Sequence, residues 1–271
     1  MSSILFEIKN SIGFITLNRP DKLNSFNREM ALLMQEKLDA CKSNDIRCVF
    51  ITGAGKVFSA GQDLAEVAPS PNSVPSLREP PKGEEPMLMK KILSEHYNPI
   101  VMRIKKLEKP VVAAINGVAA GAGANIALCC DIVVAAESAS FLQAFSKIGL
   151  IPDSGGTHTL PRLIGWQKAS ALMMLGEKVS ATEAERIGMI YKIFPDENFL
   201  ANATNIAEYL AKMPTRGLAF TKQLLSMSFT TTLNEQLQDE DIFQQKAAAT
   251  KDFKEGVQAF LEKRIPIFKG E

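Results

Sequence analysis

Three glycine-containing segments of the sequence carry residues that could do chemistry. They are FSAGQDL (58–64), GVAAGAGANIAL (117–128) and IGLIPDSGGT (148–157). Small residues let a ligand approach the main chain closely, and unpaired N–H groups at the start of a helix can stabilise negative charge on an oxygen. The third segment adds a carboxyl group, Asp153, between a proline and a Gly-Gly pair. Together they indicate a site that stabilises an oxyanion, with an acid nearby.

Each segment also allows another interpretation. The second is partly similar to a dinucleotide-binding fingerprint, but Ile126 stands where the third glycine or alanine belongs, and no acidic residue follows at the expected distance. The DSGG of the third is similar to the nucleophile segment of chymotrypsin-like proteases, but the helix-rich C-terminal part of this chain argues against a two-barrel protease. Asp153 could also cap a helix that begins at 154–157.

Composition excludes several classes of function. The 271 residues are 46% hydrophobic and 23% charged, as in an ordinary soluble globular chain. There are 31 Lys and Arg against 30 Asp and Glu, so the net charge of +1 offers no basic field for nucleic acid, which is not expected as a partner. His96 and His158 have no metal-ligand spacing, so no metal site is expected.

Cysteine usage and the first residues point to one compartment. Cysteines 41, 48, 129 and 130 form no CxxC pair, which indicates buried thiols in a reducing environment. The start, MSSILFEIKN, lacks the features of a signal peptide, so we expect a cytoplasmic protein. Residues 111–130 carry no charge and are long enough to cross a bilayer, but their glycines and asparagines favour a buried strand, a glycine turn and a buried helix. No membrane association is expected.

The elements that must position the three segments alternate between strand and helix. Strands are predicted at 12–17, 47–52 and 132–136, and an amphipathic helix at 28–42. This alternation predicts an α/β core over residues 1–195, with elements on both sides of buried strands. Helical spacing at 200–213, 218–226, 233–250 and 253–264 predicts a separate helical module over 196–271, with Thr215 or Thr221 as a candidate cap.

One stretch fits neither a helix nor a sheet. Six of the 14 prolines fall between Pro69 and Pro86, within a loop that we place at 66–90. Long irregular loops are often either surface insertions or lids beside a site. The sequence leaves both interpretations open.

Five segments in the same order resemble the enoyl-CoA hydratase/isomerase family, also called crotonases. They are NRPDKLNSF (18–26), FSAGQDL (58–64), KPVVAAINGVAAGAGANIALCCDI (109–132), FSKIGLIPDSGGT (145–157) with PRLIG (161–165), and EGVQAFLEKRIPIFKG (255–270). The resemblance covers nearly the whole chain. It implies a spiral of ββα units, a C-terminal helical trimerisation module, and an acyl-CoA substrate bound by a homotrimer or a dimer of trimers. Coenzyme A would be part of the substrate, and no separate cofactor is implied.

The resemblance also implies roles for individual residues. It assigns the two N–H groups that hold the thioester oxygen to Ala60 and Ala122. Asn125 and Phe145 occupy the positions of the two glutamates of the family's hydratases, which leaves Asp153 as the acid facing the acyl group. Phe145, Tyr97 and Ile148 could line an apolar acyl pocket. The candidate substrate contacts are Lys22, Leu23, Asn24, Gln62, Asp63, Leu64, Asn125, Phe145, Phe260 and Lys263, the last two commonly supplied by a neighbouring subunit.

A single carboxylate favours an isomerase. It can take a proton from one carbon and return it to another, while two N–H groups stabilise the intermediate dienolate. Segments 96–125 and 143–157 look most like those of family members that convert a ring epoxide of an aromatic acyl-CoA to a seven-membered ring, with Δ3,Δ2-enoyl-CoA isomerase activity. Hydration, dienoyl-CoA isomerisation, dehalogenation with Asp153 as nucleophile, and a non-catalytic CoA-ester-binding scaffold remain alternatives.

Overall fold

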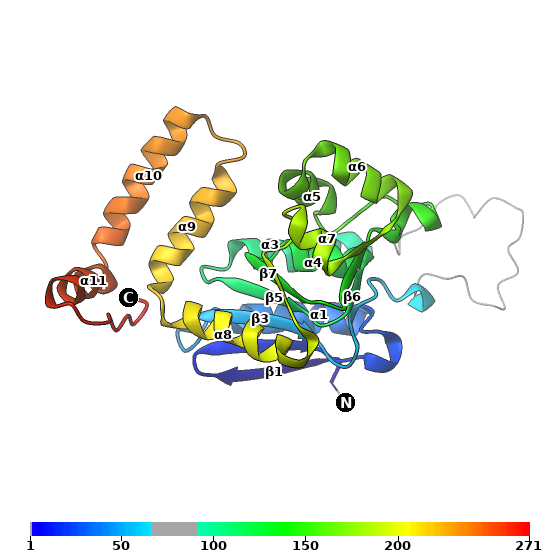
Figure 1. Cartoon of the computed structure of the whole chain (residues 1–271), viewed down its shortest axis with the longest axis horizontal. Helices are drawn as coiled ribbons and strands as arrows, with labels where there is room; N and C mark the ends of the chain where they lie inside the picture. The colour runs from blue at the N-terminus through cyan, green and yellow to red at the C-terminus, as the bar shows by residue number, and fades with distance from the viewer. Residues whose placement is uncertain (1, 67–90) are drawn as a thin grey trace, which may run out of the picture.

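Two sheets lie at the centre of the chain (Figure 1). The computed structural model describes residues 2–66 and 91–271, so the proline-rich loop expected at 66–90 lies, beyond Glu66, outside the described residues. The six-stranded sheet runs in the order β1 (Ile4–Lys9), β2 (Ile12–Leu17), β3 (Cys48–Gly53), β5 (Val111–Ile115), β7 (Ile132–Ala136) and β10 (Lys192–Phe194). The four-stranded sheet runs in the order β4 (Val57–Ser59), β6 (Val118–Ala120), β8 (Ser140–Leu142) and β9 (Lys178–Ser180).

Successive passes of the chain add one strand to each sheet. β3 leads into β4, β5 into β6, and β7 into β8, and each strand pairs in parallel with the corresponding strand of the previous pass. The long strands are apolar, and all five residues of β5 are buried, as expected for parallel strands covered on both faces. The predicted α/β class and the spiral of ββα units are confirmed. The strands predicted at 12–17 and 132–136 are correct, and the one predicted at 47–52 lies one residue later.

Helices cover the six-stranded sheet, and the faces that they bury carry either regularly spaced large apolar residues or alanines. α1 (Arg28–Ala40) buries Met30, Met34 and Leu38, which lie four residues apart on one face, and packs against α3 (Asn98–Lys106). α8 (Phe199–Lys212) lies against β2, β3, β5, β7 and β10 and buries alanines at 203, 207 and 211, so its backbone comes close to the sheet. The remaining helices of this part are α4 (Gly121–Leu128), α5 (Gly156–Ile164), α6 (Trp166–Leu175) and α7 (Ala181–Arg186).

The uncharged stretch at 111–130 folds as the sequence predicts. It forms β5, then a turn through Asn116 and Gly117, then β6 and α4, a short helix that is buried from its second residue onward. Within the described ranges, the structure contains no helix long and apolar enough to span a membrane. The four cysteines are buried, as expected.

The last three helices form an arm that stands away from both sheets: α9 (Thr215–Met227), α10 (Leu233–Ala248) and α11 (Lys251–Glu262) (Figure 1). The expectation that Thr215 or Thr221 caps one of them is wrong. α9 follows Pro214 without a side-chain cap, and the Thr221 hydroxyl donates to a carbonyl within its own helix. The caps are Thr232, which forms a capping box on α10, and Thr250 on α11. The division at 195/196 stays a prediction.

Candidate active site

The turn at residues 22–24 is held by hydrogen bonds to residues that precede it and to residues that follow it in the sequence. Leu23 and Asn24 both have a φ of 52°, and Asn24 is fully buried. The Asn24 side chain accepts from the Arg19 N–H (2.8 Å) and donates to the carbonyls of Ala54 (2.8 Å) and Val57 (2.6 Å). Its polar atoms are therefore used by the fold. The exposed neighbours Lys22 and Leu23 are the members of this predicted set that a ligand can reach.

In the segment after β4, one of the two predicted oxyanion donors differs from the prediction. The Ala60 N–H donates to the Leu23 carbonyl (2.9 Å), so it is already paired and the assignment of Ala60 is wrong. Phe26 bonds to both neighbours of Gln62, accepting from Asp63 N–H (2.8 Å) and donating to the Gly61 carbonyl (2.7 Å). In an extended chain alternate N–H groups point to opposite sides, so the Gln62 N–H points away from Phe26. It has no acceptor among the residues that the structure describes.

The second predicted donor, Ala122, lies beside this segment. Ala122 is the second residue of α4, so its N–H has no acceptor within the helix. Gly61 has a φ of +88°, and a Cβ placed on it would lie 3.2 Å from the Ala122 nitrogen and 2.9 Å from the Ala120 oxygen. Only glycine permits this backbone conformation and this close approach. The N–H groups of Gln62 and Ala122 therefore come from adjoining segments.

Asp153 lies in the turn that precedes α5. Its side chain is partly buried, and burial raises its pKa to about 6, although a hydrogen bond from the Ser154 hydroxyl (2.9 Å) opposes that rise. Gly155 is the N-cap residue of α5, and no side chain makes a capping hydrogen bond there. The alternative role of Asp153 as the helix cap is therefore excluded. The Asp153 carboxyl group therefore titrates closer to neutral pH than an ordinary aspartate does.

Asn125 supports this turn from α4. Its side chain is fully buried, donates to the Asp153 carbonyl (2.9 Å) and accepts from Gln143 (2.8 Å). A Cβ on Gly156 would come within 2.3 Å of the Asn125 amide, so the two segments are in close contact. Asn125, predicted as a substrate contact, thus uses its amide to position the main chain of the Asp153 turn. No motif in the sequence links Gln143 to Asn125, so its role is visible only in the folded structure.

Two of the three residues expected to line an apolar pocket lie at this site. The buried Phe145 ring faces the start of α4, since a Cβ on Gly121 would lie 3.7 Å from it. Tyr97 is fully buried and donates from its hydroxyl to Gln62 Oε1 (2.5 Å). Burial, and secondly the charge of Asp153, raise the pKa of Tyr97. The third residue, Ile148, is 53% exposed.

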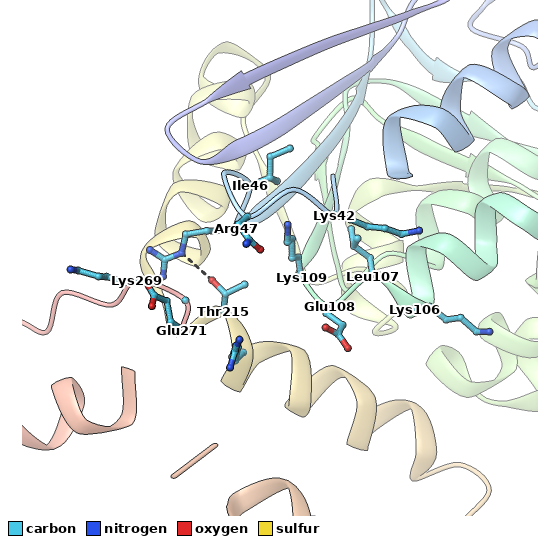
Figure 2. A pocket seen from close by; sticks show the side chains of 13 residues that line it. Lys42, Ile46, Arg47, Lys106, Leu107, Glu108, Lys109, Thr215, Lys269 and Glu271 are labelled. Atoms are coloured by element: carbon cyan, nitrogen blue, oxygen red, sulfur yellow. Dashed lines mark hydrogen bonds between the residues drawn. The ribbon is translucent and has the colours of Figure 1, made fainter. Parts of the chain in front are cut away.

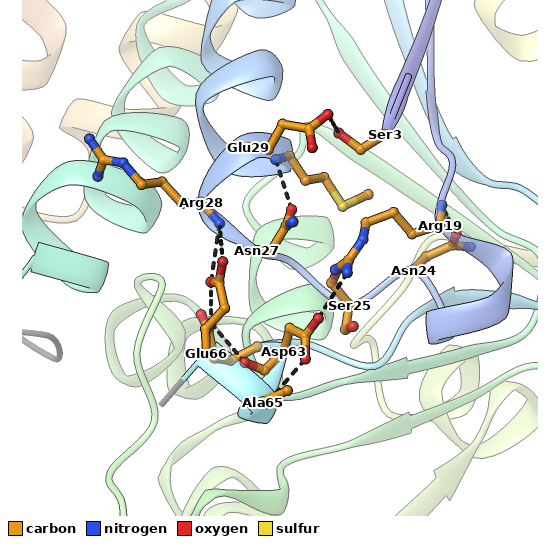
Figure 3. Close-up of polar contacts among 12 residues, drawn as sticks. Ser3, Arg19, Asn24, Ser25, Asn27, Arg28, Glu29, Asp63, Ala65 and Glu66 are labelled. Atoms are coloured by element: carbon orange, nitrogen blue, oxygen red, sulfur yellow. Dashed lines mark hydrogen bonds and ion pairs between the residues drawn. The ribbon is translucent and has the colours of Figure 1, made fainter. Parts of the chain in front are cut away.

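Asp63 and Leu64 lie at the rim of the site. The Asp63 carboxylate pairs with Arg19 (2.9 Å) and accepts from the Ala65 N–H (3.2 Å), so it holds the segment in place (Figure 3). Leu64 is about half exposed and is the first residue of a short 3₁₀ turn, Leu64–Glu66. Of these two predicted substrate contacts, only Leu64 presents an unoccupied surface.

Phe260 and Lys263 are not brought to Asp153 within this chain. They lie on α11 and at its C-terminal end, in the arm, whereas Asp153 precedes α5, and these two helices lie apart (Figure 1). The Phe260 side chain is 82% exposed.

A cavity of about 690 Å³ lies elsewhere, where the arm joins the sheets (Figure 2). Its lining is mostly charged and includes Lys42, Arg47, Lys106, Lys109, Glu108, Thr215, Arg216, Lys269 and Glu271. None of the predicted catalytic residues lines it.

The chain is similar to known proteins along almost its whole length. A family model described as enoyl-CoA hydratase/isomerase matches residues 7–271. The chain is 45% identical to the 1,2-epoxyphenylacetyl-CoA isomerase of Escherichia coli (strain K12), over 100% of both chains. It is 38% identical to a protein of Rhodobacter capsulatus named probable enoyl-CoA hydratase, over 99% of this chain and 98% of that protein. A crystal structure of an enoyl-CoA hydratase from Bacillus anthracis superposes with a TM-score of 0.89 at 33% identity, over 99% of this chain and 100% of the other.

Proposed function

From the premise that this chain belongs to the enoyl-CoA hydratase/isomerase family, we propose that it is an isomerase of acyl-CoA esters. The proposed substrate is ring-1,2-epoxyphenylacetyl-CoA, converted to 2-oxepin-2(3H)-ylideneacetyl-CoA in phenylacetate degradation, with Δ3,Δ2-enoyl-CoA isomerase activity in addition. The name of the Escherichia coli relative supports this choice. The observation that carries the isomerase class is the partly buried carboxyl group of Asp153, whose turn is held by Asn125 of α4, the helix that also supplies the Ala122 N–H. Coenzyme A is part of the substrate, and the proposal needs no separate cofactor.

The proposed mechanism moves one proton. The ionised Asp153 takes it from the carbon next to the thioester carbonyl, and the N–H groups of Gln62 and Ala122 stabilise the negative charge that develops on the thioester oxygen. Each such donor contributes about 3 to 4 kcal/mol in a site that excludes water. The protonated Asp153 then returns the proton to a carbon further along the acyl group. In the ring epoxide, the ring carbon–carbon bond that the epoxide oxygen spans breaks as the double bonds shift, so the product keeps every atom of the substrate. With a pKa near 6, Asp153 is mostly ionised at pH 7, yet it becomes an adequate acid after the first step.

The fold argues against water addition. In a two-glutamate hydratase a water molecule is held between the two carboxylates. Here Asn125 and Phe145 stand at the corresponding positions, and the Asn125 amide is occupied by Asp153 and Gln143. Neither residue can act as a general base.

The proposal is tested by offering the purified protein three esters in parallel: 1,2-epoxyphenylacetyl-CoA, a 3-enoyl-CoA and crotonyl-CoA. We expect turnover of the first two without a gain of water in the product mass. Activity confined to hydration of crotonyl-CoA would overturn the proposal. Binding of all three esters without turnover would favour a CoA-ester-binding scaffold.

Replacing the carboxyl group tests its role directly. We expect Asp153→Asn to lower kcat by roughly 10² to 10⁴ while the ester still binds, because the amide cannot accept the proton. The matched control is Asp45→Asn, at an exposed aspartate, which should keep the wild-type kcat. Wild-type turnover by Asp153→Asn would contradict the assignment. A covalent adduct on Asp153 in quenched wild-type mixtures would show a nucleophile instead of a base.

We also propose that the chain assembles in the cytoplasm as a homotrimer or a dimer of trimers through the helical module. The exposed Phe260 and Lys263 would then reach the CoA moiety of a neighbouring subunit, which fits their distance from Asp153 in their own chain. Light scattering should give three or six times the chain mass of 29.6 kDa. A monomer that turns over the ester at the full rate would contradict this arrangement.

A further inference from the structure

One buried hydroxyl near the site takes no part in the mechanism described above. Tyr97 is the last residue of a π-helical turn, Ile92–Tyr97, that leads directly into α3. π-helical turns insert an extra residue into a helix, and they occur frequently at functional sites. The Tyr97 ring is fully buried and packs edge-on against Phe26, with ring centroids 6.1 Å apart. Its hydroxyl extends beyond Phe26 to the segment after β4.

The hydroxyl completes a set of contacts that fixes Gln62. On the main-chain side, Phe26 bonds to Gly61 and Asp63, the two neighbours of Gln62. On the side-chain side, Gln62 Oε1 accepts from Tyr97 (2.5 Å), and its Nε2 donates to the Asp63 carbonyl (3.3 Å) and to Glu66 (3.4 Å). The 2.5 Å bond is the shortest of these contacts. The Gln62 peptide is therefore held from both sides.

We propose that Tyr97 is a positioning residue, whose hydroxyl holds the Gln62 side chain and so keeps the Gln62 N–H directed at the substrate oxygen. This inference rests on the proposed function, in which that N–H stabilises the enolate. A donor with a fixed direction contributes most when charge is concentrated on the oxygen, which happens in the transition state. Loss of the hydroxyl should therefore lower kcat more than it weakens substrate binding.

Tyr97 acts in this arrangement only as a hydrogen-bond donor. Burial and the neighbouring charge of Asp153 raise the pKa of its phenol, so the hydroxyl stays protonated at neutral pH. It cannot replace Asp153 as the base.

The first test is kinetic. Tyr97→Phe keeps the buried ring and removes only the hydroxyl, and it should lower kcat about 5- to 50-fold with KM changed by less than about threefold. Tyr209→Phe, at a tyrosine that is 62% exposed, is the matched control and should behave as wild type. Gln62→Met keeps the peptide N–H but removes the acceptor, and the double variant should be no slower than the slower single variant. Independent, multiplying losses would overturn the proposal, and so would a wild-type kcat in Tyr97→Phe.

The second test needs no substrate, so it separates this inference from the proposed function. Hydrogen exchange of the peptide covering residues 58–66, followed by mass spectrometry, should be at least about fivefold faster in Tyr97→Phe than in wild type and in Tyr209→Phe. Unchanged exchange would overturn the proposed contact. An absence of isomerase activity in wild-type protein, combined with faster exchange in the variant, would reject the proposed function and retain the role of Tyr97 in holding the segment.

Discussion

The Asp153 turn and the junction between the arm and the sheets both bury charged side chains, but they differ in how many partners each charge has. At the junction, the Lys222 ammonium group donates to the carbonyls of Ile104 (2.7 Å) and Lys109 (3.2 Å) and to the Asp131 carboxylate (2.8 Å). These contacts tie α9 to the end of α3 and to the strands behind it. All three protons of the ammonium group have acceptors.

The same pattern extends to the end of the chain. Arg47 donates to the Thr215 hydroxyl, visible in Figure 2, and to the carbonyls of Met213 and Phe268. Burial lowers the pKa of Arg47, and the charge of Asp252 opposes that shift. The Asp252 carboxylate in turn accepts from two main-chain N–H groups, at 2.6 and 2.7 Å. Buried or partly buried charges with several hydrogen-bond partners fasten the arm to the sheets in this way.

Asp153 has fewer partners. Among the described residues, its carboxylate accepts from one other residue, the Ser154 hydroxyl, whereas the Asp252 carboxylate accepts from two, and burial still raises the pKa of Asp153 to about 6. The ionised form is therefore less stable in the folded protein than in water. Burial alone therefore does not mark a functional charge. A buried charge with a full set of partners holds structure, whereas a buried charge with few partners remains available to a ligand.

The largest effect is expected at the junction. Lys222→Met should lower the free energy of unfolding by about 2 to 4 kcal/mol, because the Asp131 carboxylate and two carbonyls lose their donor while the apolar stem is kept. Urea unfolding measures the change. Lys254→Met, at an exposed lysine of the arm, should stay within about 0.5 kcal/mol of wild type. A Lys222→Met protein as stable as wild type would show that these contacts do not stabilise the junction.

An intermediate effect of opposite sign is expected at the site. The folded-state pKa of Asp153, about 6, lies above its ordinary value of 3.8, so its contribution to stability is present below pH 4 and lost as pH rises through 6. Asp153→Asn cannot ionise, so it should exceed wild type in free energy of unfolding by about 1 to 3 kcal/mol at pH 8, with the difference vanishing near pH 4. Urea unfolding at both pH values measures it. A less stable variant at pH 8 would show that the charge is structural.

The smallest effect concerns Ser154, whose hydroxyl donates to the Asp153 carboxylate. Ser154→Ala removes a hydrogen bond that lowers the pKa of Asp153, so the acidic limb of kcat/KM should move to higher pH. Activity should fall roughly 2- to 5-fold at pH 6 and remain unchanged at pH 8.5. Ser154 has a φ of 52°, which glycine adopts freely, so Ser154→Gly should shift the limb equally while relieving the backbone. An unmoved limb in both variants would mean that the hydroxyl does not tune the acid.

Much of the core was predictable because buried parallel strands have a distinctive composition and because glycine turns end them. The motif likeness also located the three segments that meet at the site. It could not decide which N–H of residues 58–64 is free, since that depends on pairing with Leu23 and Phe26, more than 30 residues away in the chain. The roles of Asn125 and Gln143 were hidden for the same reason: their partners are set by tertiary contacts.

The contact between Asn125 and Gly156 bears on how such a fold exchanges one reaction for another. The amide fills the space beneath the Asp153 turn, and a Cβ on Gly156 would already collide with it. A glutamate at 125 would be longer by one methylene and would place negative charge against the Asp153 carbonyl, where a donor now lies. A two-glutamate arrangement at this place would therefore require coordinated changes at positions 125, 143 and 145, so several residues would have to change together.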